Sequence, residues 1–437
     1  MRRKIISTVL LLAFAVFCPR LRAQATLLLE EPYSYDGAFA GTGHAAVYLA
    51  RVCAASPVEL RRCKPDERGI VISRYHGIAG YDWLAVPFNT YLYAVENPDQ
   101  IPLYADPKLV AFLRQQALAK IKAALPADTT DTPNAPWYEL AGSAYDRTLY
   151  GFQIATTPAQ DDAFIRHWND APNREAYNLL KRNCADFARD VINFYYPKAV
   201  HRSIIEDLGV TTPKQTAKTL QHFSKRHPQA ELTTFIIPQV PGMKRSRPVH
   251  GVLDSVLLAK KYAMPLALLH PMMVGGAEIA YWTGWRFHPP SDAPIFDPIH
   301  GLQAPLQTAE RRNYERQLKA LQRDQLEGVP APAEWPRLQA QSDPQLDQAG
   351  RPILVMQDEI GAVEVGLSHA NILRTPAPPQ LVQQLLVVRL QYELKSGGPS
   401  RASAESVATD WRLLQQALNT PTREVAAGTQ SQSLAGK

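Results

Sequence analysis

The chain has 437 residues, of which 46% are hydrophobic and 20% charged, and it contains only four cysteines. These proportions are those of a folded globular protein, so they exclude a largely disordered chain, a collagen-like repeat and a disulfide-dense miniprotein. The formal net charge is +6, but much of the basic excess lies in the first 25 residues. It therefore gives no reason to expect nucleic-acid binding.

Residues 1–25 have the pattern of a secretory signal peptide. A basic start at residues 2–4 precedes an apolar stretch at residues 5–18, and residues 23–25 read Ala-Gln-Ala, an A-x-A cleavage site. The apolar stretch is shorter than the ~20 residues that a membrane-spanning helix needs. Cleavage after Ala25 removes five basic residues and leaves 42 basic against 41 acidic residues. We therefore expect an exported protein, periplasmic or secreted, with nearly balanced charge.

Cleavage would leave three cysteines, Cys53, Cys63 and Cys184. The first two are ten residues apart in a loop that can close as a hairpin, and an oxidising compartment favours a disulfide between them. Two free, partly buried thiols are the alternative. Cys184 then has no partner in the chain, which is the pattern of a reactive thiol or of an intermolecular bridge.

Residues 26–200 are predicted to form one α+β domain. β-Branched and aromatic residues predict strands, which we place at residues 43–52, 69–75, 82–95 and 149–156. Apolar residues at helical spacing predict helices, which we place at residues 108–125, 159–170 and 184–196.

Residues 201–300 are predicted to be an accessory segment. Within it, residues 262–277 carry no charge, but prolines make this stretch too short and interrupted to span a membrane. We expect a buried core segment there, with a membrane-surface patch as the alternative. Residues 301–437 are predicted to be a mainly helical C-terminal region. Its expected parts are helices at 306–326, 378–394 and 402–418, a hairpin at 351–367, a Pro-rich linker at 328–345 and a disordered polar tail.

The segment Asn183-Cys184-Ala185-Asp186-Phe187 is the most informative for chemistry. Asn183 is a good N-cap, so Cys184 falls in the first turn of a helix. The unpaired N–H groups and positive potential of a helix start favour a thiolate, and the same amides can stabilise an oxyanion. The alternative is that Cys184 is a small buried hydrophobic residue.

A thiolate nucleophile needs a general base and acid, most often a histidine. His44 follows Gly43 at the mouth of a predicted strand, where it can face the start of a helix, although a surface or capping histidine has the same pattern. The sequence has no HExxH, GxxxxGK[ST], GxSxG or CxxC motif. It therefore predicts neither a cofactor nor a metal site.

The strand GHAAVYL and the later helix start NCADF together resemble the circularly permuted branch of the papain-like cysteine superfamily. This branch includes lecithin–retinol acyltransferase-like proteins and permuted relatives of NlpC/P60 peptidases. The resemblance covers about residues 30–200 and implies an antiparallel sheet with a helix that bears the nucleophile. It places His44 at the family's base and Cys184 at its nucleophile. Residues 161–191 also resemble the exported domain of bacterial lipoprotein N-acylation transamidases. This group often has Thr and Arg after the cysteine, whereas this chain has Ala185, Asp186 and Phe187.

The superfamily places a polar residue on the strand after the histidine-bearing one, where it orients the imidazole. We predict His76, at the end of GIVISRYH, for this role, with Ser73 and Tyr75 as alternatives. In acyltransferase-like relatives the second histidine follows the first more closely than it does here, so a histidine with only a structural role is the other interpretation.

The sequence thus predicts an exported cysteine-dependent acyl-transfer enzyme, either a hydrolase or an acyltransferase, that works through a thioester. The expected substrate is an amide of a cell-wall peptide or an acyl group of a lipid or lipoprotein, with possible membrane-surface contact. The alternatives are a non-catalytic binding protein on the same scaffold and a dimer bridged through Cys184.

Overall fold

The structure is a computed structural model, and it describes residues 23–420 with gaps. The gaps are residues 36–37, 41–42, 128, 132–134, 175, 179–180, 203–209, 245, 247–267, 273–274, 276–286, 325–334, 359–360 and 396–401. Most of the predicted signal peptide and the polar tail after residue 420 therefore lie outside the described residues.

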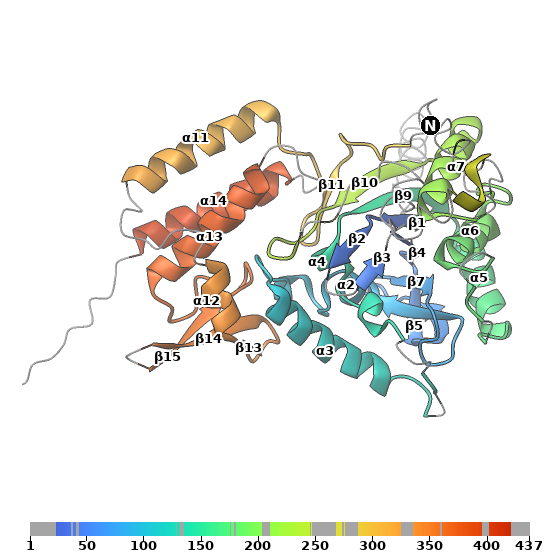
Figure 1. The fold of residues 1–437 in the computed structure, drawn as a ribbon, viewed down its shortest axis with the longest axis horizontal. Coiled ribbons are helices and arrows are strands. Elements are labelled where there is room, and N and C mark those ends of the chain that lie inside the picture. The colour runs from blue at the N-terminus through green and yellow to red at the C-terminus, as the bar shows by residue number, and fades with distance from the viewer. Residues whose placement is uncertain are drawn as a thin grey trace, which may run out of the picture.

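An eight-stranded sheet forms the first lobe (Figure 1), in the order β12-β11-β10-β9-β1-β4-β7-β8. All neighbouring pairs are antiparallel except β10 and β11, which are parallel. The strands are β1 (Ala23–Glu30), β4 (His44–Leu49), β7 (Ile70–Arg74), β8 (Trp83–Pro87), β9 (Leu149–Thr156), β10 (Thr233–Ile237), β11 (Ile295–Asp297) and β12 (Gly301–Gln303). The predicted α+β class is confirmed.

Strand β1 lies inside the sheet, between β9 and β4. Its apolar run is continuous because both faces of the sheet are covered, and Leu27, Leu28 and Leu29 are all buried. The first three residues of β1 are the predicted cleavage motif, and Ala25 lies opposite both Leu49 and Ile154. Cleavage after Ala25 would remove the start of this strand, and the position of the cut stays a prediction.

Helices cover both faces of the sheet (Figure 1). One face packs against α5 (Pro158–Asp170), α6 (Cys184–Tyr195) and α7 (Pro213–Arg226) through a cluster that includes Phe164, Phe187 and Leu220. The other face packs against α2 (Phe88–Tyr93), α3 (Pro107–Ala123) and α4 (Ser143–Asp146). The predicted helix bounds agree with α3, α5 and α6 to within two residues at each end.

Two predictions about this lobe are wrong. Residues 82–95 do not form one strand, because Pro87 ends β8 and α2 begins at Phe88. Residue 200 does not bound the sheet either, since β10, β11 and β12 come from beyond it. The β-branched run of β10 pairs with β9 and extends the sheet into the segment predicted to be accessory.

The C-terminal lobe packs helices on a small antiparallel sheet (Figure 1). Its elements are α11 (Thr308–Asp324), α12 (Trp335–Gln341), β13 (Asp343–Leu346), β14 (Pro352–Asp358), β15 (Gly361–Gly366), α13 (Pro379–Leu394) and α14 (Ala404–Asn419). The expected hairpin is β14–β15, and the expected helices are α11, α13 and α14. The predicted linker at 328–345 is wrong for its second half, where the fully buried Trp335 begins a helix that packs into the core.

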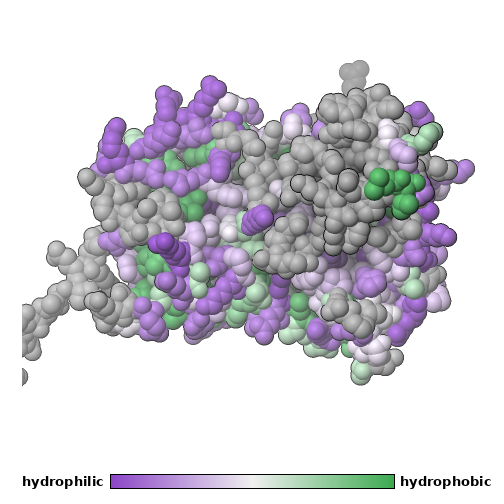
Figure 2. Space-filling model, in the orientation of Figure 1, coloured by the Kyte–Doolittle hydropathy of each residue, from purple (hydrophilic) through white to green (hydrophobic). Residues whose placement is uncertain are grey.

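The described part of the uncharged segment 262–277 is exposed. Leu268, Leu269 and Met272 are 77%, 73% and 88% exposed, so the expectation of a buried core segment is wrong for these residues. Figure 2 shows a face that is mostly hydrophilic or neutral, with hydrophobic residues in separate patches. Among the described helices, none has both the length and the apolar character needed to cross a bilayer.

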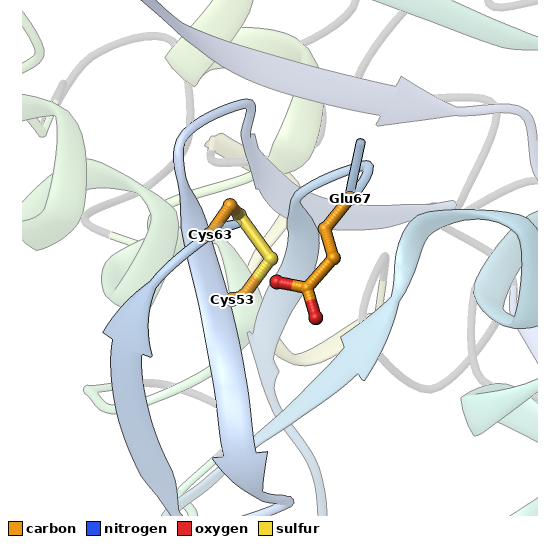
Figure 3. A group of neighbouring side chains, drawn as sticks. All are labelled: Cys53, Cys63 and Glu67. Carbon is orange, nitrogen blue, oxygen red and sulfur yellow. A yellow bond between two sulfur atoms is a disulfide. The ribbon is translucent and has the colours of Figure 1, made fainter. Parts of the chain in front are cut away.

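Strands β5 (Val52–Ser56) and β6 (Glu59–Arg62) form the expected hairpin, and a disulfide joins Cys53 to Cys63 (Figure 3). Glu67 lies beside the two sulfur atoms, so the three residues have the spacing of a metal site. The sulfurs are bonded to each other, however, and the Glu67 carboxylate accepts hydrogen bonds from the Arg61 guanidinium at 2.7 and 2.8 Å. These bonds lower the pKa of Glu67 to about 2. The disulfide and the Arg61–Glu67 pair therefore close a loop, and these residues are poorly suited to bind a metal ion.

Replacing both Cys53 and Cys63 by serine is expected to lower the free energy of unfolding by roughly 3 kcal/mol, the chain-entropy value for so short a loop. The sequence separation of the two cysteines is 10. Urea unfolding of both proteins under oxidising conditions measures the difference. A loss below about 1 kcal/mol would show that the Arg61–Glu67 clamp closes the loop without the covalent bond.

Candidate active site

Cys184 is the first residue of α6, and hydrogen bonds from Asn183, Asp186 and Thr211 fix the turn that carries it. Asn183 caps the helix: its side-chain oxygen accepts a hydrogen bond from the Asp186 N–H at 2.9 Å, and the Asp186 carboxylate accepts one from the Asn183 N–H at 3.3 Å. Thr211 closes the network, because its hydroxyl donates to Asp186 at 2.6 Å and its carbonyl accepts from the Asn183 amide at 2.9 Å. The predicted cap at Asn183 is present, and it fixes where α6 begins.

The capping bonds leave the first two amides of the helix unused. In the described part of the chain, the N–H groups of Cys184 and Ala185 have no acceptor. They lie at the positive end of the helix dipole. Both can therefore donate to an oxyanion that develops on an acyl group attached to Cys184.

His44 is the first residue of β4 and is 5% exposed. Cys184 lies near enough to its imidazole to raise the pKa of this histidine, so the structure brings the two predicted residues together. The His44 Nε2 atom lies 2.9 Å from the Ser73 Oγ atom, and the Ser73 hydroxyl donates to the Ala45 carbonyl at 2.9 Å. A hydroxyl has one proton, so we assign Nε2 as the donor to Ser73. This assignment leaves Nδ1 as the ring nitrogen that Ser73 does not engage.

The surroundings of His44 favour its charged form. Burial lowers the pKa of this imidazole, but the charge and hydrogen bond of Cys184, followed by the charges of Glu30 and Glu139, outweigh burial and raise the pKa to about 9. The Tyr75 ring stacks against the imidazole with centroids 5.6 Å apart. The charge on Cys184 therefore favours the imidazolium form of His44, which is the partner that a thiolate nucleophile requires.

A buried charged cluster adjoins His44. Glu30 is opposite His44 in the β1–β4 ladder and is fully buried. Its carboxylate accepts hydrogen bonds from the hydroxyls of Tyr91 and Ser143, the latter at 2.6 Å, and lies 3.3 Å from the Nε atom of Arg147. The sequence analysis missed Glu30. The signal that the sequence offers is a charged residue at the end of the apolar run Leu27-Leu28-Leu29, in the last position of β1.

The predicted third residue, His76, is not brought to the pair. It is exposed, and its ring packs edge-on against Tyr177 at 5.3 Å. The reason is that β7 ends at Arg74, so His76 lies past the end of the strand from which Ser73 reaches His44. Ser73, one of the alternatives, occupies the expected place. Tyr177 also lies near Cys184, because burial and then the charge of Cys184 raise the pKa of this tyrosine above its usual value.

Comparison with known proteins adds little to this geometry. No family model matches the chain, and no curated protein matches it. One similar solved structure is that of the type VI secretion system effector TseH, which is 14% identical with a TM-score of 0.24. The alignment covers 49% of this chain and 98% of the effector. A likeness at this TM-score carries no argument about activity.

Proposed function

We propose that this protein is an exported cysteine-dependent acyl-transfer enzyme on a permuted papain-like scaffold. The observation that carries the proposal is the placement of Cys184 at a helix start beside the buried His44, whose imidazole Ser73 holds and whose pKa Cys184 helps to raise. The chain order supports it as well, because the histidine strand precedes the cysteine helix and α6 packs against β4 and β7 of an antiparallel sheet.

The site can perform acyl transfer with its own residues. The Cys184 sulfur attacks the acyl carbonyl carbon and forms a C–S bond, while the carbonyl electron pair moves to the oxygen and is stabilised by the amides of Cys184 and Ala185. Collapse expels the amine or alcohol, which takes its proton from His44. Water or a second amine or hydroxyl then attacks the thioester, gives its proton to His44 and releases the thiolate. Ser73 keeps the imidazole in place throughout.

The proposed substrate is an envelope molecule, either an amide of a cell-wall peptide or an acyl group of a lipid or lipoprotein. The exposed Leu268, Leu269 and Met272 support the lipid-linked acyl group, because clustered exposed apolar side chains favour contact with a membrane surface. Location in the periplasm or outside the cell is part of the same proposal, and the Cys53–Cys63 disulfide supports it.

The test is the pH dependence of iodoacetamide alkylation at Cys184 in the purified protein, followed by peptide mass spectrometry. We expect a midpoint well below the ~8.5 of a free thiol. Incubation with a p-nitrophenyl acyl ester is expected to add one acyl group to Cys184. A thiol that reacts only in denaturant, or that never takes up the acyl group, would leave the binding-protein alternative.

A further inference from the structure

We propose that Asp82 is a positioning residue for the Cys184–His44 pair and that it acts through Arg182 and Arg74. The inference rests on the proposed function. Arg182 stands two residues before Cys184, and Arg74 follows Ser73, the residue that holds His44. The carboxylate of Asp82 therefore joins the two chain segments on which the pair depends.

One carboxylate holds two guanidinium groups. The Nε and Nη2 atoms of Arg74 donate to Asp82 Oδ1 and Oδ2 at 2.7 and 2.8 Å, a two-point contact in which both side chains are buried. The Nη2 atom of Arg182 donates to Asp82 Oδ2 at 3.0 Å. Charge-assisted bonds of this kind are short and directional, so they fix the distance between β7 and the segment that enters α6.

The backbone at Asp82 is fixed by hydrogen bonds to Asn173, independently of the two arginines. The Asn173 side chain pairs with the next residue, Trp83, accepting from its N–H at 2.9 Å and donating to its carbonyl at 3.0 Å. The Asn173 carbonyl also accepts a hydrogen bond from the Asp82 N–H. Asp82 is thus fixed to the start of β8 and does not depend on Arg182 for its position.

Arg74 contacts α6 directly as well. Its guanidinium lies over the Phe187 ring at 5.1 Å from the centroid. Phe187 is three residues after Cys184, in the first turn of the helix. The capping bonds between Asn183, Asp186 and Thr211 do not involve Asp82, so α6 can form without it. What Asp82 sets is the place of the helix start relative to β7, and hence the position of Cys184 relative to His44.

The experiment compares Asp82→Asn with a matched control, Asp161→Asn. Asp161 is a buried aspartate of α5 that pairs with Arg51 at 2.7 Å, beyond the other end of β4 from His44. We expect Asp82→Asn to slow alkylation of Cys184 at pH 7 by about tenfold and to raise the alkylation midpoint by about one pH unit. Asp161→Asn is expected to keep the wild-type pH profile even if its melting temperature falls.

Arg182→Gln is the second variant. It leaves the buried Arg74–Asp82 pair intact, so it tests the contact between Arg182 and Asp82 even if Asp82→Asn fails to fold. We expect the alkylation midpoint to shift in the same direction. An alkylation profile like that of the wild type in the folded variants would overturn the inference, whatever happens to stability. A wild-type midpoint at the ordinary thiol value overturns the proposed function and the inference together, whereas an activated wild type without a variant effect overturns the inference alone.

Discussion

Cys184→Ala is expected to lower acyl transfer by at least about a thousandfold, because no other described group near His44 can form the thioester. The same change is expected to lower the pKa of His44 from about 9. The reason is that Cys184 provides the leading interactions that raise this pKa, and burial, which lowers it, then dominates. A carbon-detected NMR titration of the imidazole measures the shift.

The melting temperature of Cys184→Ala is the control for this prediction, because it shows whether the variant keeps its fold. Cys184 is half-buried and contributes one sulfur atom, so we expect the melting temperature of Cys184→Ala to stay within a degree or two of the wild type. Cys184→Ser keeps the size of the side chain and gives a matched comparison. A collapsed melting curve would identify Cys184 as a core thiol, and an unchanged pKa of His44 would show that the two residues are not coupled.

Glu30→Ala is expected to lower the free energy of unfolding by about 3–5 kcal/mol, the usual cost of removing one partner from a buried ion pair. Arg147 is 2% exposed, and its buried charge would lose the carboxylate that lies 3.3 Å from its Nε atom. The hydroxyls of Tyr91 and Ser143 would lose their acceptor as well, which adds to the loss. Urea unfolding gives the value.

Glu96→Ala is the control for this prediction. Glu96 pairs with Lys120 at 2.7 Å, but both side chains are exposed, so we expect a change below about 1 kcal/mol. Joint replacement, Glu30→Leu with Arg147→Met, removes both charges and is expected to restore part of the stability that Glu30→Ala loses. An equal loss in the single and double variants would show that the charges do not account for the effect.

The elements that were predicted well are those with local signals. Strand β9 has the predicted bounds, and α6 differs by one residue at its end, because a cap, a proline and an apolar period are all read within a few residues. The pairing of β10 with β9 has no such signal. Which strand joins which edge depends on contacts between distant segments, and the predicted boundary at residue 200 is wrong for that reason.

In the candidate site, too, the residues with local sequence signals were predicted and those that depend on distant contacts were not. A cap, a strand start and the family resemblance together led to the prediction of Cys184 and His44, which the structure brings together. The third position was harder, because it depends on where β7 ends: Ser73 still faces β4, and His76 lies past the end of the strand. Glu30 and Asp82 act across the fold, through Arg147 and Arg182. Neither role is visible in a sequence until the partner is known.

The place of β1 in the sheet has a consequence for folding kinetics. On one side β1 pairs with β4, which is near in sequence, and on the other with β9, where Leu27 meets Phe152. Distant pairings form slowly, since the entropy of a long loop is lost before the contact is gained. The meander β1-β4-β7-β8 can therefore assemble first and carry His44, while Cys184 arrives with a segment that follows β9. We expect Cys184 to gain its reactivity late in refolding, after β9 has joined the sheet. The rate of Cys184 labelling during refolding therefore reports when the sheet is complete.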